Sequence, residues 1–558
     1  MSKKKRLIKQ RLQESLEGQQ AVKKNPLFER LGYHIILSFF VLFTYFNSIG
    51  NAFLSDDIFG IVENPHIGEW SNVTSSSFHF FQPLVYYILY HLGGLNPILF
   101  RLINIFAHLG SVNLIFLIVC TLLTPLAAFI AAALFAVHPL LSEPIVWISG
   151  GTFVWYSFFF FLSFYWYIKS IHRKVFYYFS LVAFWMSVTT GAPAVVLCGV
   201  FVLYEMSFGD IRKRWKYAVP YILLSGLFAF IAIKGIGSRL TSIETNFYQQ
   251  ETSYNPILQI PVAISSYIEL FVWPAALTLY HSELHFDMWT YALKVMVMSG
   301  VFISIIIGYV KNKYVFFGLS LFVLSLLPTL TPIAVAWVVA ERYVYFGTFG
   351  LIFITAYFLS KLSKVNEGIL YGVLISLILV FSVRTIIRNV DWRNEDNLWI
   401  ATGKTSPSDP KTHNNLGDTY ARRGDLQKAA EEFGMAIQLN PQYADAYHNL
   451  GNIYRQMGET EKAEKLFRQA LDINPNIWQS HQNLAAIYYE RKDYQNAEKY
   501  SLEAIKLKQD LPQLYNNLGV VYMQSGQLEK AHASFQKSLS LNPHDEFAQK
   551  ALVELQKK

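Results

Sequence analysis

The chain has 558 residues, of which 53% are apolar, 16% aromatic and only 15% charged. Because a soluble protein carries about 25% charged residues, this composition excludes a wholly soluble chain and indicates that much of it lies in lipid. The formal net charge of +8 belongs to the first 401 residues, where basic residues beside apolar segments are expected of a membrane protein and do not indicate nucleic-acid binding.

Residues 1–30 hold a basic segment that we interpret as a cytoplasmic tail, because no short apolar core with a cleavage site follows it. A membrane-spanning helix needs about 20 apolar residues. When the chain is threaded through eleven spans, basic clusters such as 210–216 and 311–313 fall on the side of the N-terminus, as the positive-inside rule expects. The sequence therefore predicts a multi-pass membrane domain over 31–388, with the C-terminus outside the cytoplasm. The predicted spans are 31–53, 97–122, 125–140, 150–168, 175–191, 193–208, 217–235, 290–310, 314–330, 346–360 and 368–388.

One further apolar stretch, 257–280, is long enough to cross a membrane. A span there would move the basic clusters at 311–313 and 361–364 to the outer side, against the positive-inside rule. We therefore interpret this stretch as an interfacial or re-entrant part of a long outer loop over 236–289.

The C-terminal part of the chain is a repeat with a period of 34 residues. Leu-Gly pairs, tyrosines, alanines, phenylalanines and prolines keep register over four units, and this pattern resembles the tetratricopeptide repeat, in which paired antiparallel helices stack. The third unit differs from the other three: Ser501 replaces the aromatic residue and Gln509 replaces the proline. We predict a linker over 389–409, an α-solenoid of four repeats over 410–545 and a polar capping helix over 546–558.

Asparagine occupies one position in all four units, just before the Leu-Gly pair. A carboxamide both donates and accepts, so a column of them can bind the backbone of an extended peptide acceptor. The nucleocytoplasmic O-linked N-acetylglucosamine transferase has a similar ladder. Asparagine is also common at this position in such repeats for packing reasons, and both interpretations stay open. The four predicted acceptor-binding residues are Asn415, Asn449, Asn483 and Asn517.

Charged groups near lipid are costly, so those at the outer ends of the predicted spans are candidate functional residues. Asp56 and Asp57 follow the first span, and a carboxylate pair there can act as general base on a hydroxyl. Arg342 can hold a lipid phosphate. The reaction that needs both is transfer of a sugar from a lipid-phosphate carrier. The other candidates are Arg101 and His138 for the phosphate, and Glu143, Glu341, Tyr343 and His108 as further active-site residues.

Each candidate has a structural alternative. The two aspartates can cap or solvate a loop, and Arg342, next to Tyr343, can anchor the chain in an aromatic belt at the membrane surface. His138 precedes a proline and fits a packed helix end. Taken singly, His138 and His108 favour the structural interpretation.

Several segments together resemble a known family. They are "FLSDDIFGIVENP", "FFQPLVYYILYHLGG", "FRLINIFAHL", "AVHPLLSEPIVWISG", "ERYVYFGTFGL" and "DWRNEDNLWIATGKTSPSDPKTHNNLG". Their order is that of the transmembrane-and-tetratricopeptide-repeat O-mannosyltransferase family, which belongs to the C-type glycosyltransferases that use lipid-phosphate sugars. The resemblance covers nearly the whole chain. It implies an eleven-span core with the catalytic side and the repeats outside, and it implies that Asp56 is the base of the pair.

The chain departs from the family at a few positions. Gln82 stands where the family has arginine, Arg101 where it has histidine, and the charged residues that the family has near Gly151 and near Val188 and Thr189 are missing. These departures leave open whether the sugar donor is changed and whether activity is retained.

The sequence as a whole predicts an inverting membrane glycosyltransferase. It would move one sugar from a polyprenyl- or dolichyl-phosphate carrier to a hydroxyl, on Ser or Thr of a protein held by the repeats. The alternative is a non-catalytic, membrane-anchored repeat scaffold. No cofactor, metal or nucleic-acid partner is expected, since no phosphate-binding loop or Cys/His cluster occurs in the sequence. A bacterial or archaeal cell membrane is the expected location rather than the endoplasmic reticulum.

Overall fold

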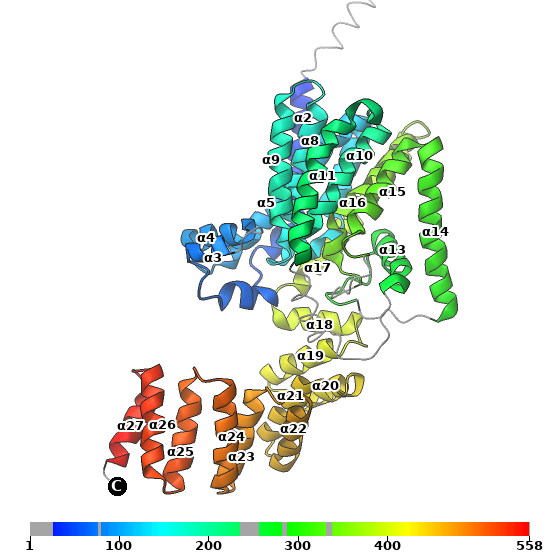
Figure 1. Cartoon of the computed structure of the whole chain (residues 1–558). Helices are drawn as coiled ribbons and strands as arrows, with labels where there is room; N and C mark the ends of the chain where they lie inside the picture. Colours follow the sequence, from blue (N-terminus) through cyan, green and yellow to red (C-terminus); the bar gives the residue numbers. More distant parts are fainter. Residues whose placement is uncertain (1–25, 76–79, 235–255, 282–286, 331–337, 557–558) are drawn as a thin grey trace, which may run out of the picture. The chain divides into compact units, whose positions relative to one another are not determined.

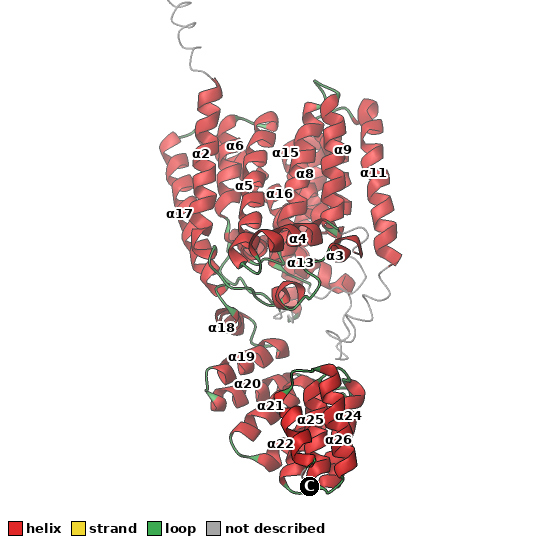
Figure 2. Cartoon of the chain, turned by 90° about the vertical axis from the view of Figure 1, so that its left-hand side faces the viewer, coloured by secondary structure: helices red, strands yellow, loops and turns green. Residues whose placement is uncertain are grey.

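The structure, a computed structural model, describes residues 26–75, 80–234, 256–281, 287–330 and 338–556. The chain divides into two compact units, and the boundary falls between Leu398 and Trp399. All regular elements within the described ranges are helical (Figures 1 and 2), which confirms the predicted all-α class.

The first unit is a helical bundle in which α5 and α6 begin at clear sequence signals. Asn96 caps α5 by accepting a hydrogen bond from the Ile98 amide at 3.1 Å, and Thr124 caps α6 in the same way through Ala127. A proline follows each cap at the first helical position, where its missing N–H costs nothing. The helices up to this point are α2 (Pro26–Tyr45), η1 (Phe46–Ser48), η2 (Ile58–Val62), α3 (Trp70–Ser75), α4 (Phe81–Gly93), α5 (Pro97–Leu122) and α6 (Pro125–Val137).

The remaining helices of the first unit surround α6, which lies at the centre of the bundle. Every residue of α6 from Ala127 to Val137 except Phe129 is buried, and its alanines let α5, α16 and α2 pack closely against it. These helices are η3 (Pro139–Leu141), α7 (Ser142–Val146), α8 (Gly151–Lys169), α9 (Val175–Thr190), η4 (Ala192–Leu197), α10 (Cys198–Ser207), α11 (Ile211–Lys234), α13 (Pro256–Val272), α14 (Met288–Lys311), α15 (Lys313–Leu326), η5 (Glu341–Val344), α16 (Tyr345–Leu362) and α17 (Glu367–Asp391).

Apolar helices identify the first unit as a membrane domain. Six helices of the described chain are long and apolar enough to cross a membrane, or seven if the pair on either side of His138, bent by 56°, is one span. Side chains such as Ile306 of α14 and Leu379 of α17 are exposed and apolar, as expected of a surface that faces lipid. Each of the eleven predicted spans contains a helix, but the count of eleven stays a prediction. The stretch 257–280 holds the shorter helix α13 and then leaves helical structure at Trp273.

The predicted linker over 389–409 is mostly helical. Residues 389–391 complete α17, Trp392 is fully buried in the first unit, and α18 (Glu395–Thr405) follows. The segment is therefore ordered structure on both sides of the unit boundary.

The second unit stacks the helix pairs of the repeats and closes with α27. In three repeats a phenylalanine ring packs against the glycine of the Leu-Gly pair, so closely that a Cβ on Gly451 would lie 2.7 Å from Phe467. The turn inside each of these repeats uses a glycine at positive φ, and the third repeat has Lys492 there at 63°. The helices are α19 (Pro410–Arg422), α20 (Leu426–Leu439), α21 (Ala444–Gln456), α22 (Thr460–Ile473), α23 (Trp478–Glu490), α24 (Tyr494–Leu507), α25 (Pro512–Gln524), α26 (Leu528–Leu541) and α27 (Glu546–Leu555).

Candidate active site

One buried arginine of α5 fixes the loop between α2 and η2, the loop that carries the two aspartates. Arg101 Nη1 donates to the carbonyl oxygens of Asn51 at 2.6 Å and Ile49 at 3.3 Å, and Nη2 donates to Ala52 at 2.9 Å. Its Nε donates to the Val146 carbonyl at 2.8 Å, and the side chain is fully buried. The prediction that Arg101 binds the donor phosphate is therefore corrected: its guanidinium is engaged by backbone and orders the loop.

Asp57 is a buried carboxylate that holds the same loop from inside. Its Oδ2 accepts from the Leu54 amide at 3.1 Å, and its Oδ1 accepts from the Ser149 amide at 2.8 Å and from the Ser149 hydroxyl. Burial raises the pKa of Asp57 to about 6, although these hydrogen bonds and the charge of Arg101 oppose the rise. Every polar contact of Asp57 tightens the loop, which indicates a positioning residue.

Asp56 differs from its neighbour because its side chain is exposed. Partial desolvation raises the pKa of Asp56, while the positive charge of Arg342 lowers it. Residue 55, just before it, adopts a φ of 51°, in the left-handed region that is unfavourable for serine. The Ser55 amide donates to Glu395 Oε1 at 2.5 Å, and this contact holds the strained turn that presents Asp56.

Arg342 is the cation whose charge acts on Asp56, and it is rigidly held. Its Nη1 donates to Glu143 Oε1 at 2.5 Å, and its guanidinium lies over the rings of Trp147 and Tyr343, 5.4 and 5.1 Å from their centroids. Glu143 is fully buried and its Oε2 has no hydrogen-bond partner among the described residues. Among the described residues the guanidinium makes no other hydrogen bond, and a guanidinium carries five N–H donors.

A second buried ion pair lies beside the first. Glu341 Oε1 accepts from Arg388 Nη2 at 3.3 Å and from the Thr278 amide at 2.6 Å. Arg388 lies over the ring of Trp392, and Trp392 stacks on Trp147 at a centroid distance of 6.0 Å. The two arginines and two indoles thus form one continuous stack, which fixes the orientation of Arg342.

The two histidine candidates are packing residues in this structure. His138 accepts from the Leu140 amide through Nδ1, and its Nε2 lies 3.0 Å from the Phe271 carbonyl oxygen. His108 Nδ1 lies 2.8 Å from the Tyr345 hydroxyl, in a fully buried position. Because both ring nitrogens of His138 are engaged, the predicted role of His138 at the donor phosphate is corrected to that of a helix-end cap, as its structural interpretation expected.

The structure brings Asp56, Arg342, Glu143, Glu341 and Tyr343 together from three distant segments, and it adds residues that the sequence interpretation missed. The additions are Ser149, Trp147, Arg388 and Trp392. Arg388 ends a predicted span, so the cost of charge near lipid could have marked it. The two tryptophans and Ser149 lie in segments that the family resemblance already included, but no feature of their residue type distinguishes them from ordinary packing residues.

Apart from Arg101, the positions at which the chain departs from the family contribute no charge to this site. Gln82 Nε2 donates to the Tyr86 hydroxyl at 3.0 Å, and Thr189 Oγ1 donates to carbonyls of its own helix. Val188 is buried in α9. Gly151 lies against the Asn104 side chain, so that a Cβ there would be only 2.1 Å from Asn104 Oδ1.

The asparagine column of the repeats is half-buried and partly engaged within the array. Asn449 Nδ2 donates to Asn414 Oδ1 at 3.0 Å, and Asn483 Nδ2 donates to Asn452 Oδ1 at 2.7 Å. Each amide group keeps further donor or acceptor capacity. The contacts fit both a packing role and a peptide-binding role. Asn415 and Asn517 are also half-buried.

Comparison with known proteins defines the class of the second unit. Family models described as tetratricopeptide repeat match residues 410–476, 448–512 and 512–545, so this part of the chain is a tetratricopeptide-repeat array. Among solved structures, a thermophilic repeat protein of Thermus thermophilus matches with a TM-score of 0.26 and 22% identity, covering 31% of this chain and 93% of that one. The crystal structure of MamA protein matches with a TM-score of 0.25 and 22% identity, over 26% and 81%.

Curated relatives extend the similarity into the membrane domain. The Protein O-mannosyl-transferase TMTC3 of Homo sapiens is 25% identical over 461 residues, which covers 71% of this chain and 50% of the relative. The Protein O-mannosyl-transferase TMTC4 of Homo sapiens is 25% identical over 431 residues, covering 64% and 57%. These matches confirm the resemblance indicated by the motifs. The chain spans about half the length of the curated relatives that it matches.

Proposed function

We propose that the chain is a membrane glycosyltransferase that moves a mannose from a lipid-phosphate carrier to a Ser or Thr hydroxyl of a protein. The similarity to proteins named O-mannosyl-transferases supports the reaction class. The observation that carries the proposal is the pairing of an exposed carboxylate, Asp56, with a rigid arginine, Arg342, from segments far apart in the sequence. A base for the acceptor and a cation for the leaving phosphate are the two groups that the reaction requires.

Asp56 acts as the general base. It removes the proton of the acceptor hydroxyl as that oxygen forms a bond to the anomeric carbon, and the bond from this carbon to the carrier phosphate breaks. The phosphate leaves from the opposite face, so one displacement inverts the anomeric centre. Partial desolvation raises the pKa of Asp56 and makes it a better base, while Arg342 keeps it ionised.

Arg342 receives the charge that develops on the leaving phosphate. Its guanidinium needs no reorganisation, because Glu143 and Trp147 already hold it in place. The second carboxylate oxygen of Glu143, Oε2, lies in the same cluster, where it can accept from a sugar hydroxyl. The repeat array binds the acceptor protein, and its half-buried asparagines form hydrogen bonds with the acceptor backbone.

The test is transfer of labelled mannose from a synthetic lipid-phosphate donor to a Ser/Thr peptide, with the full chain in detergent. Asp56→Asn should lower the rate by about two to four orders of magnitude. Arg342→Ala should lose about two to three orders of magnitude, with partial recovery in Arg342→Lys, because an ammonium cannot replace the bidentate fork. Glu69→Gln, an exposed acid beyond the same loop, is the matched control and should be unaffected. Normal rates in both site variants would remove Asp56 and Arg342 from the mechanism, whereas no transfer by the unmodified protein would favour the non-catalytic scaffold.

A further inference from the structure

The four repeats differ in one packing detail. In the first, second and fourth repeats a phenylalanine ring fills the space beside a glycine of the preceding helix: Phe433 lies against Gly417, Phe467 against Gly451 and Phe535 against Gly519. In the second repeat the ring of Phe467 also contacts the ring of His448, with centroids 5.6 Å apart.

The third repeat has no ring in this position. Ser501 replaces the phenylalanine and Ala485 replaces the glycine, and 34 residues separate each from its counterpart in the second repeat. A Ser501 side chain is too short to reach the space that a phenyl ring fills, and Ala485 restores only one methyl group of the missing volume. A gap is therefore expected between α23, α24 and α25.

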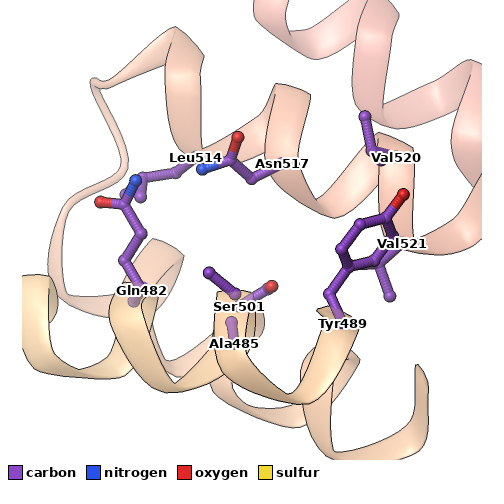
Figure 3. Close-up of a pocket in the computed structure, with 10 residues that line it drawn as sticks. Gln482, Ala485, Tyr489, Ser501, Leu514, Asn517, Val520 and Val521 are labelled. Carbon is purple, nitrogen blue, oxygen red and sulfur yellow. The ribbon is translucent and has the colours of Figure 1, made fainter. Parts of the chain in front are cut away.

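The structure has an open pocket at this place, and its empty volume of about 590 Å³ includes space that is open to solvent (Figure 3). Ser501 lies at its base, and Gln482, the counterpart of His448, lies at its edge. The pocket thus includes the space of the missing ring. Its other lining residues are Ala485, Ala486, Tyr489, Ala504, Leu514, Asn517, Val520 and Val521.

The wall of the pocket is mostly apolar, with the Ser501 hydroxyl at its base and polar side chains at its edge. Ala485, Ala504 and Leu514 are buried and present only hydrocarbon. At the edge, Gln482 and Asn517 carry amides that both donate and accept. Asn517 belongs to the asparagine column, so the pocket opens beside the groups that are suited to a peptide backbone.

We propose that this pocket binds an aromatic side chain of an extended polypeptide segment, whose backbone is held by Asn517 and Gln482. The occupant follows from the repeat itself, because a phenyl ring fills the equivalent space in the other three units. An aromatic residue in the same polypeptide as the modified hydroxyl would then help to select the acceptor. That the bound segment is an acceptor rests on the proposed function; the binding itself does not.

The test uses the full chain in lipid nanodiscs and two fluorescein-labelled peptides of Gly, Ser and Thr, one with a single central Phe and one with Ala instead. Burying a phenyl ring predicts that the Phe peptide binds about 10- to 100-fold more tightly in an anisotropy titration. The double variant Ala485→Gly/Ser501→Phe rebuilds the packing of the other repeats and should remove the preference without loss of thermal stability. The control Ser540→Phe adds a ring at an exposed position of α26 and should keep the preference.

Photo-crosslinking gives an independent measurement. A benzoylphenylalanine in place of the central Phe should crosslink to α23–α25 of the unmodified protein and not of the double variant. Equal binding of the two peptides, or a preference that survives in the double variant, would overturn the proposal. Preferential binding of the Phe peptide without any sugar transfer would refute the proposed function but support the aromatic pocket. Sugar transfer without a preference for the Phe peptide would support the proposed function but refute the aromatic pocket.

Discussion

Replacing Arg101 distinguishes a loop anchor from a phosphate ligand. The guanidinium satisfies four backbone carbonyl oxygens and also offsets the charge of buried Asp57. Each buried acceptor left without a partner costs about 1–3 kcal/mol. Because a freed loop can turn some of these carbonyl groups to solvent, Arg101→Leu should destabilise the protein by roughly 3–5 kcal/mol in total. Arg101→Lys keeps the charge, but its ammonium group cannot reach both ends of the loop. It should therefore recover only part of the lost stability.

The assay combines thermal unfolding in detergent, limited proteolysis of the loop and binding of the lipid-phosphate donor. Lower stability and faster cleavage between Ile49 and Asp57, with donor affinity within a few-fold of the unmodified protein, are the expected results. A matched control is Arg384→Leu, because Arg384 also donates to two carbonyl oxygens but does so away from this loop, at Pro274 and Ala275. Unchanged stability of Arg101→Leu together with a large loss of donor affinity would refute the anchor role and restore the phosphate role.

Four further outcomes are expected. Burial raises the pKa of Asp57 above its value in the unfolded chain, so the protonated carboxyl favours the folded state at low pH. This stabilisation of roughly 3 kcal/mol should disappear as the pH rises from about 4 to about 6. The unfolding midpoint of Asp57→Asn should lack this pH-dependent step, and the same pH dependence in the variant and the unmodified protein would contradict the prediction. Asn449→Ala with Asn483→Ala should raise the acceptor KM without slowing transfer to a short free peptide, and unchanged KM would leave the column as packing only. Lys492→Gly should stabilise the repeats by about 1 kcal/mol, since φ at Lys492 is 63°, measured against Lys499→Gly inside α24, which should destabilise them. A cysteine at exposed Gln513 should react with a membrane-impermeant maleimide in intact cells, and labelling only after lysis would contradict the extracytoplasmic placement.

Much of the fold could be predicted because its signals are local. Apolar runs of the required length predicted helices at all eleven span positions, and the 34-residue register predicted every helix pair of the repeats. The ordered segment 389–409 was missed because its anchor, the buried ring of Trp392, packs against Trp147, which is remote in sequence. A polar segment between two domains is predicted to be a linker when the partners of its few apolar residues lie far away in the sequence.

The candidate site could be predicted in its members but only partly in their roles. The cost of charge near lipid correctly singled out residues that converge, since Asp56, Glu143 and Arg342 do lie in one cluster. The same rule included Arg101 and His138, whose polar atoms meet backbone carbonyls instead. Sequence shows that a buried charge needs a partner, and it does not show whether that partner is a ligand or the chain's own backbone.

The segment that leads to the repeats also closes the loop that carries Asp56. Asn51 Nδ2 donates to the Asn389 carbonyl at 3.0 Å, and the Ala52 amide donates to the Arg393 carbonyl at 3.0 Å. The Ser55 amide meets Glu395, 340 residues further along the chain. These contacts hold the loop against the turn between α17 and α18. The strained conformation at residue 55 depends on these contacts. Changes in this turn therefore act on the proposed base, which gives a physical reason for the polar stretch that follows the last predicted span.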